Sequence, residues 1–312
     1  MNRGLETLLG NMQSVIMGEE ENLRYILVAL LSEGHVLLEG LPGVGKTKMA
    51  LALSKSIEGK FKRIQFTPDV LPSDITGYYL YNKETGQMEF RQGAAICNIL
   101  LADEINRASP RVQSSLLEVM EERQITVEGK TFKLPAPFMV IATQNSIENE
   151  GTYPLPEAQL DRFFMKLHIS YPDRRDWKRI IEHYQMEDPV ARLSAVMDLK
   201  ELNDMKEQVR EVFTSDPIIE YILDVIHQIN SYEVVEMGIN PRGSIALVKG
   251  AKAWAFLQGR DYVLPDDVQQ VIMPILAHRL KLKASYEAQS EHGIRIIREA
   301  LSKVKVPVNH GK

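Results

Sequence analysis

The chain has 312 residues, of which 44% are hydrophobic and 25% are charged; this is typical of globular proteins, and the length favours two domains. Its formal net charge of −5 disfavours broad nucleic-acid binding, which usually needs a basic face. No apolar run approaches the roughly 20 residues that span a bilayer, and the N-terminus lacks the apolar stretch of a secretory signal. Cys97 is the single cysteine, which excludes an internal disulfide and suits a reducing compartment. We therefore expect a cytoplasmic protein with no membrane span.

Residues 1–33 are expected to form two helices with a break at Met17 and Gly18. Leu5, Leu8 and Met12 recur at helical spacing in the first of them. Because this segment leads into the strand before a nucleotide-binding motif, Met17 and Gly18 are candidate neighbours of a nucleotide base. Packing of the two helices against each other is an equally good explanation of these residues.

The most informative stretch is residues 40–47, which read G-L-P-G-V-G-K-T and fit the phosphate-binding pattern G-x-x-x-x-G-K-[ST]. An apolar strand is expected before it, over residues 35–39, and a helix after it, over residues 48–55. The glycines let the backbone turn sharply and direct its N–H groups to phosphate oxygens at the positive end of that helix. We expect Lys46 to contact the β- and γ-phosphates of ATP and Thr47 to bind Mg²⁺. The full candidate set is Gly40, Leu41, Pro42, Gly43, Val44, Gly45, Lys46 and Thr47.

Residues 61–66 predict a second strand, and residues 67–93 form an insertion rich in Pro, Gly and Asp with a hairpin about residues 82–86. Long insertions in compact domains are usually functional.

A third strand, from residue 99, ends in the carboxylates Asp103 and Glu104. The carboxyl edge of a parallel sheet is where ligands bind. Asp103 is therefore the candidate to hold Mg²⁺ through water, and Glu104 is the candidate general base that polarises the attacking water.

Further elements follow in order: a helix over residues 110–122, a second hairpin over 124–134, a strand from 138 and a last strand over 164–169. Asn145 closes the strand from residue 138, near the expected position of a γ-phosphate.

From Pro172 onward the pattern is helical. The expected helices cover residues 174–184, 199–212, 217–231, 242–258, 265–282 and 294–304. We therefore expect an α/β core over residues 1–171 and an all-helical lid over 172–312. Arg242, near the start of one lid helix, is directed back toward the core, and Trp177 and Trp254 are expected in the lid interior.

With these elements in order, the chain resembles the AAA+ ATPases, and more narrowly their MoxR family. The resemblance covers nearly the whole length. It implies a P-loop NTPase fold, with a parallel αβα core and a C-terminal helical lid. The 67–93 insertion resembles the helix-2 insert of that branch, and the 124–134 hairpin resembles its pre-sensor-1 hairpin. The residues that carry the resemblance are 40–47, 101–108 (L-A-D-E-I-N-R-A), 142–145 (A-T-Q-N) and, most specifically, 151–163 (G-T-Y-P-L-P-E-A-Q-L-D-R-F).

By position, the resemblance implies that Asn145 is sensor 1, Arg162 the arginine finger and Arg242 sensor 2. Arg242 could serve its own site or a neighbour's, and a structural ion pair is the alternative role for Arg162. The chain departs from the family pattern at Ser146, where proline is common, and around Arg242, where the segment reads N-P-R-G. Other candidates for a site completed across subunits are Arg107, Arg111 and Arg123.

A finger acting across subunits implies a homo-oligomeric ring, expected to be a hexamer. The resemblance further implies chaperone-like remodelling or maturation of a protein client, together with a von Willebrand factor A domain partner. Nucleic acid is not an expected partner. Two alternatives remain: a motor of the magnesium chelatase or nucleic-acid type, and a nucleotide-gated assembly scaffold with little hydrolysis.

Overall fold

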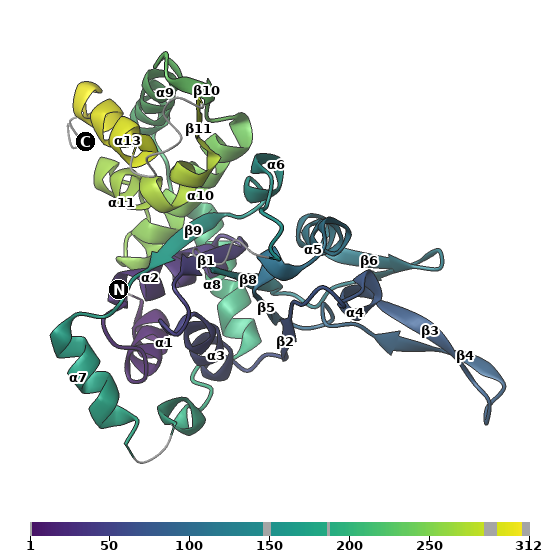
Figure 1. Ribbon diagram of the computed structural model, residues 1–312. Coiled ribbons are helices and arrows are strands. Elements are labelled where there is room, and N and C mark those ends of the chain that lie inside the picture. The colour runs from purple at the N-terminus through teal and green to yellow at the C-terminus, as the bar shows by residue number, and fades with distance from the viewer. Residues whose placement is uncertain (1, 146–150, 186–187, 284–291, 308–312) are drawn as a thin grey trace.

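The computed structural model describes residues 2–145, 151–185, 188–283 and 292–307. Its centre is a five-stranded parallel sheet in the order β2-β5-β8-β1-β9 (Figure 1). The strands are β1 (Val36–Gly40), β2 (Phe61–Gln65), β5 (Ile99–Asp103), β8 (Met139–Asn145) and β9 (Met165–Ile169).

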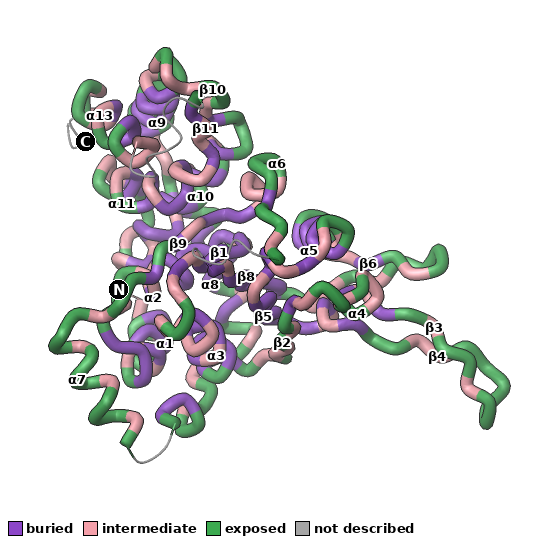
Figure 2. The backbone as a smooth tube through the Cα atoms, in the orientation of Figure 1, coloured by how far each residue is buried: buried purple, intermediate pink, exposed green. Residues whose placement is uncertain are grey.

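Helices cover both faces of this sheet, which is why its central strands are almost wholly buried (Figure 2). Side chains alternate between two cores: Leu38 of β1 belongs to the core shared with α1 and α2, and its neighbour Leu37 belongs to the core shared with α5. The helices of the α/β core are α1 (Arg3–Gln13), α2 (Glu20–Leu31), α3 (Lys46–Ser56), α4 (Pro72–Thr76) and α5 (Pro110–Glu122).

The register of the sheet brings the motif-bearing strand ends to one edge. Gly40 at the end of β1 lies opposite Asn145 of β8 and Ile169 of β9. A Cβ atom on Gly40 would lie 2.3 Å from the Ile169 carbonyl oxygen, so this glycine is also required by close strand approach.

Both hairpins expected from the sequence are present and extend from one side of the core (Figure 1). The two hairpins pack on each other through the stacked rings of Phe90 and Phe132, whose centroids are 4.6 Å apart. Their strands are β3 (Gly77–Asn82) with β4 (Gln87–Gln92), and β6 (Gln124–Val127) with β7 (Lys130–Lys133).

The C-terminal helices α9, α10, α11 and α13 pack together beyond the β9 edge of the sheet (Figure 1). The helix expected over residues 265–282 ends at Leu276. A short 3₁₀ helix (Ala277–Arg279) follows, and the chain then enters a two-residue strand that pairs with β10. The later elements are α7 (Arg174–His183), α8 (Leu199–Glu211), α9 (Asp216–Asn230), β10 (Val235–Met237), α10 (Pro241–Leu257), α11 (Pro265–Leu276), β11 (Lys281–Leu282) and α13 (His292–Lys303).

Helix α7 lies apart from the other C-terminal helices, on the side of α1 and α3 (Figure 1). The chain after it returns to the core, where Met197 forms a parallel bridge with Ile57. Trp177 of α7 is 48% exposed, so its expected place in the lid interior is wrong, whereas Trp254 of α10 is buried as expected. Within the described residues, no helix combines the length and apolar character that a bilayer crossing requires.

Candidate active site

The loop between β1 and α3 has the backbone that phosphate binding requires. Gly43 and Gly45 have φ values of 81° and 97°, a left-handed conformation that side chains disfavour. Gly45 is the N-cap of α3, so the loop lies at the positive end of an 11-residue helix.

The Lys46 amine is buried at the ends of β1 and β8. It donates hydrogen bonds to the carbonyl oxygens of Gly40 (2.5 Å), Leu41 (3.1 Å) and Gln144 (3.2 Å). It also donates to Asn145 Oδ1 at 2.6 Å. The amine is therefore held at the strand edge, where the phosphates of a bound nucleotide would lie.

Asp103 and Thr47 meet as the expected Mg²⁺ site requires, with Thr47 Oγ1 3.3 Å from Asp103 Oδ2. Thr143 donates to the other carboxylate oxygen at 2.6 Å. Arg63 of β2 was not anticipated: its Nη2 donates to Asp103 Oδ2 at 2.7 Å. An arginine within a strand has no distinctive signal in the sequence, and the contact arises because β2 pairs with β5.

Glu104 follows β5 with a φ of 58°, an uncommon conformation for a residue other than glycine and one that clusters at functional sites. Its carboxylate accepts from Asn145 Nδ2 at 3.2 Å and pairs with Arg107 Nε at 3.2 Å. Lys46, Asn145 and Glu104 therefore form a connected series. Arg107, a candidate for action across subunits, contacts Glu104 of its own chain.

These residues fit Mg²⁺ and a nucleoside triphosphate. Mg²⁺ keeps several waters and is usually held by one or two protein oxygens together with substrate phosphates, which is what Thr47 and Asp103 offer. No group of three His, Cys, Asp or Glu in the described ranges could hold a metal by itself. The remaining ligands of a bound Mg²⁺ would come from the phosphates and water, as is usual for this ion.

A cavity of about 300 Å³ adjoins the loop and is suited to a nucleotide base. Met17 lines it, whereas Gly18 is not among its lining residues. Gly18, with a φ of 76°, turns the chain before α2 and lies close to Asp176 of α7. The rings of Tyr171 and Trp177 stack, with centroids 5.9 Å apart. The sequence does not indicate that α7 forms one side of this cavity, because nothing local in α7 shows that it lies beside the loop. The lining residues are Val15, Ile16, Met17, Glu19, Gly43, Val44, Gly45, Lys48, Met49, Tyr171, Pro172, Trp177, Ile180 and Tyr184.

Lys48 connects α3 with the segment after α7. Its amine pairs with Asp188 Oδ2 at 2.5 Å and lies 4.8 Å from the centroid of the Tyr184 ring. The cavity wall formed by α7 is thereby attached to the helix that follows the phosphate loop.

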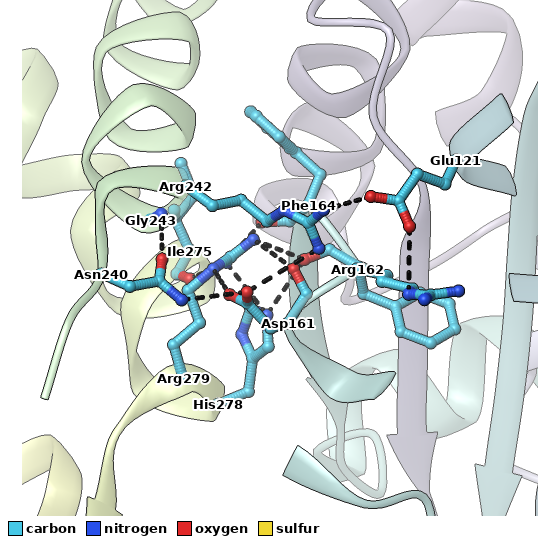
Figure 3. Close-up of polar contacts among 11 residues, drawn as sticks. Glu121, Asp161, Arg162, Phe164, Asn240, Arg242, Gly243, Ile275, His278 and Arg279 are labelled. Atoms are coloured by element: carbon cyan, nitrogen blue, oxygen red, sulfur yellow. Dashed lines mark hydrogen bonds and ion pairs between the residues drawn. The ribbon is translucent and has the colours of Figure 1, made fainter. Parts of the chain in front are cut away.

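Arg162 and Arg242 lie elsewhere. Both pair with Glu121 near the end of α5 (Figure 3). They line a cavity of about 280 Å³ that also includes His35, just before β1. Lys46 follows the other end of β1, and a five-residue strand is about 16 Å long. Both arginines therefore lie toward the end of β1 that is away from the phosphate loop. Ser146, the departure beside Asn145, lies outside the described residues.

Comparison with known proteins agrees with this architecture. The model of the ATPase family associated with various cellular activities (AAA) matches residues 35–165, and the AAA lid domain model matches residues 228–300. The chain is 39% identical to Chaperone MoxR1 of Mycobacterium tuberculosis, covering 97% of this chain and 82% of that protein. The chain belongs to the MoxR family of AAA+ ATPases.

Two further matches also cover nearly the whole chain. Protein YeaC of Bacillus subtilis is 47% identical over 97% of this chain and 96% of its own. A crystal structure from Cytophaga hutchinsonii, of a protein assigned as an ATPase, has a TM-score of 0.90 and 35% identity, covering 98% of this chain and 95% of that one. The expected P-loop fold with a parallel αβα core and a C-terminal helical lid is confirmed. The two family models leave α7 and α8 between them.

Proposed function

We propose that this protein hydrolyses ATP with Mg²⁺ at a site shared between two subunits of a ring. One chain supplies the phosphate loop, Asp103, Glu104 and Asn145, and its neighbour supplies Arg162 and Arg242. The observation that carries the proposal is the placement of both arginines at the opposite edge of the sheet from Lys46.

The residues at the loop have complementary roles in this reaction. Lys46 and the loop N–H groups hold the β- and γ-phosphates, and Glu104 takes the proton of the attacking water. The water oxygen bonds to the γ-phosphorus as the bond to the β–γ bridging oxygen breaks, which releases ADP and phosphate. Asn145 contacts both Glu104 and Lys46, so it can orient the water relative to the phosphate. Mg²⁺, when bound, neutralises charge on the phosphate oxygens.

The separation of the arginines from the phosphate loop, at opposite ends of the parallel strands, supports the proposed ring. A subunit that presents its arginine edge to the loop edge of the next makes a head-to-tail contact, and such contacts close into a ring when the rotation allows. The MoxR resemblance favours a hexamer.

The proposed output is chaperone-like remodelling or maturation of a protein client. MoxR1 is named a chaperone. On the projecting hairpin, Tyr78, Leu80, Tyr81 and Met88 are 47%, 49%, 56% and 53% exposed. Exposed apolar side chains on a projecting element are suited to contact with a polypeptide. We further propose a von Willebrand factor A domain partner and a cytoplasmic location.

A magnesium chelatase type of motor is a second candidate. The chain is 30% identical to a magnesium-chelatase subunit ChlI homolog of Methanocaldococcus jannaschii, but the match covers only 60% of this chain. The longer and closer match to MoxR1 favours the first proposal.

Mixing two variants tests the shared site. Arg162→Ala and Glu104→Gln should each reduce ATP hydrolysis to a small residual rate when tested alone. A mixed ring contains interfaces that join an intact Glu104 to a neighbour's intact Arg162, so ATP hydrolysis should return on mixing. The exposed Arg298 of α13 offers a control: Arg298→Ala should keep wild-type activity.

A second measurement follows ATP hydrolysis per protomer of the wild type as its concentration is raised. The oligomer size is determined on the same samples. Specific activity should rise cooperatively as the ring forms. An active monomer, or a mixture of the two variants that stays inactive although each still binds ATP and assembles, would refute the shared site.

A further inference from the structure

Glu121, in the last turn of α5, bridges two arginines that come from different parts of the chain (Figure 3). Its Oε2 lies 3.2 Å from Arg162 Nε, and its Oε1 accepts a hydrogen bond from Arg242 Nη2. Arg162 precedes β9 in the core, and Arg242 is the second residue of α10 in the lid.

The closest contact between Glu121 and Arg162 is made by the Nε atom of Arg162. The two terminal nitrogens of Arg162 donate no hydrogen bond within the described part of the chain, and the side chain is 33% exposed. A guanidinium held by Nε keeps its two terminal nitrogens directed outward, and these are the atoms that bind phosphate in a bidentate manner.

Asp161, next to Arg162, ties the same segment to the lid. It accepts from Arg279 Nε at 2.9 Å and from Asn240 Nδ2 at 3.0 Å, and its Oδ2 lies 3.8 Å from Arg242 Nη1. Arg279 is nearly fully buried and also donates to the carbonyl oxygen of Phe163 at 2.8 Å. The segment that carries Arg162 is therefore held by lid residues on one side and by Glu121 on the other.

Helix stability does not explain a glutamate at this position. A carboxylate in the last turn of a helix opposes the helix dipole, and α5 has no basic residue in that turn to compensate. The Glu121 side chain is 37% exposed, and ion pairs this exposed add little to folding stability. Orientation of the arginines accounts better for its position.

We propose that Glu121 is a positioning residue that holds Arg162 and Arg242 as one unit and presents them together to the γ-phosphate bound by a neighbouring subunit. This inference rests on the shared site proposed above. Because Arg242 belongs to the lid, the pair is assembled only when the lid is docked against α5. Delivery of the arginines thereby depends on the position of the lid.

The test compares Glu121→Gln with Glu122→Gln. Glu122 is the adjacent residue, is exposed and has no ion pair within the described ranges, so it is a matched control. Glutamine keeps the shape of Glu121 but is neutral. It also replaces one of the two oxygens that contact the arginines with an NH₂ group, which cannot accept a hydrogen bond from a guanidinium. We expect Glu121→Gln to lower kcat about tenfold, with an unchanged KM for ATP and unchanged ring assembly, because an interaction with the transition state is lost. Glu122→Gln should match the wild type.

Two further measurements separate positioning from a structural role. In an Arg162→Ala background, Glu121→Gln should lower kcat no further, since it acts through Arg162. Mixing Glu121→Gln with Glu104→Gln should restore turnover, because the second variant supplies correctly held arginines. Wild-type or faster turnover of Glu121→Gln would overturn the Glu121 proposal. The shared site would still be supported in that case if the mixture of Arg162→Ala and Glu104→Gln recovered turnover. Failure of the Arg162→Ala and Glu104→Gln mixture would instead refute the shared site.

Discussion

The Asn145 side-chain nitrogen lies 3.2 Å from the Glu104 carboxylate and donates to it. The oxygen of the same amide accepts from Lys46 Nζ at 2.6 Å. One side chain therefore contacts both the candidate base and the lysine expected at the γ-phosphate. The Asn145 amide therefore links the position of Glu104 to that of Lys46.

Glu104→Gln should separate binding from hydrolysis. The amide can still accept from Asn145 but cannot take a proton from water, so we expect turnover to fall by about 10²-fold or more with ATP binding retained. Phosphate release and equilibrium nucleotide binding measure the two effects. The exposed Glu58 offers a control, since Glu58→Gln should behave as the wild type. Retained hydrolysis in Glu104→Gln would show that another group is the base.

Trp177 should report nucleotide binding. It lines the cavity beside the phosphate loop, is 48% exposed and stacks on Tyr171, whereas Trp254 is buried in α10. We expect ATP to change the tryptophan emission of the wild type but not that of Trp177→Phe. Trp177→Ala should weaken ATP binding about tenfold, the scale of aromatic–base stacking. Unchanged affinity and an unchanged fluorescence response would place the base elsewhere.

Two buried histidines should make the fold sensitive to mild acid. Val140 N–H donates to His35 Nδ1 at 2.9 Å, and His35 Nε2 lies 3.0 Å from the Met120 carbonyl, so the ring is neutral. Burial lowers the pKa of His35 to about 4 and lowers the pKa of His278 well below its usual range. As pH falls from about 6.5, the unfolded chain binds protons that the folded chain does not, so the free energy of unfolding decreases.

Urea unfolding between pH 7.5 and 4.5 measures this loss. His35 alone should contribute roughly 2.5 kcal/mol of this loss by pH 4.5, from about 1.4 kcal/mol per unit of pKa. His35→Gln should lower the stability at neutral pH and reduce its dependence on pH, whereas His227→Gln, on the surface of α9, should leave that dependence unchanged. Burial is the largest influence on the pKa of Glu33 and acts upward, but the nearby Lys206, Arg210 and Arg123 outweigh it and lower the pKa to about 2. The stabilising effect of Glu33 is therefore lost only below about pH 4.5, outside this window.

If His35→Gln showed the same pH dependence of stability as the wild type, His35 would not be the source of the acid sensitivity.

Asp161→Ala should destabilise the protein strongly. Asp161 is the carboxylate partner of Arg279, whose side chain is 3% exposed and whose pKa burial lowers to about 10. Removal of Asp161 leaves a buried guanidinium without its counter-charge, which costs about 3 kcal/mol or more. Chemical unfolding measures the loss. As a control, Asp224→Ala, at an exposed position of α9, should change the free energy of unfolding by no more than about 0.5 kcal/mol. A loss below about 1 kcal/mol would show that the pair has little structural role.

Local elements were predicted well where a local rule applies. Helix α5 begins and ends where the sequence predicted, since Pro110 favours the first turn of a helix. The helix expected over residues 265–282 was predicted too long. Leu276 and Leu280 are four residues apart and continue the helical pattern, but the pairing of Lys281 with β10 overrides it.

The sequence by itself determined the phosphate loop, the Asp103–Glu104 pair, the buried strands and the helical C-terminal part. Each of these is encoded by neighbouring residues, through backbone freedom, side-chain period or spacing along one strand. Only the tertiary structure decided that Arg63 contacts Asp103, that α7 forms a wall of the cavity beside the loop, and that Arg162 and Arg242 meet at Glu121. These contacts join residues distant along the chain, and they depend on strand order and helix packing, which no local pattern encodes. The arginines lie near the amino-terminal ends of the parallel strands, and the phosphate loop lies at their carboxyl-terminal ends.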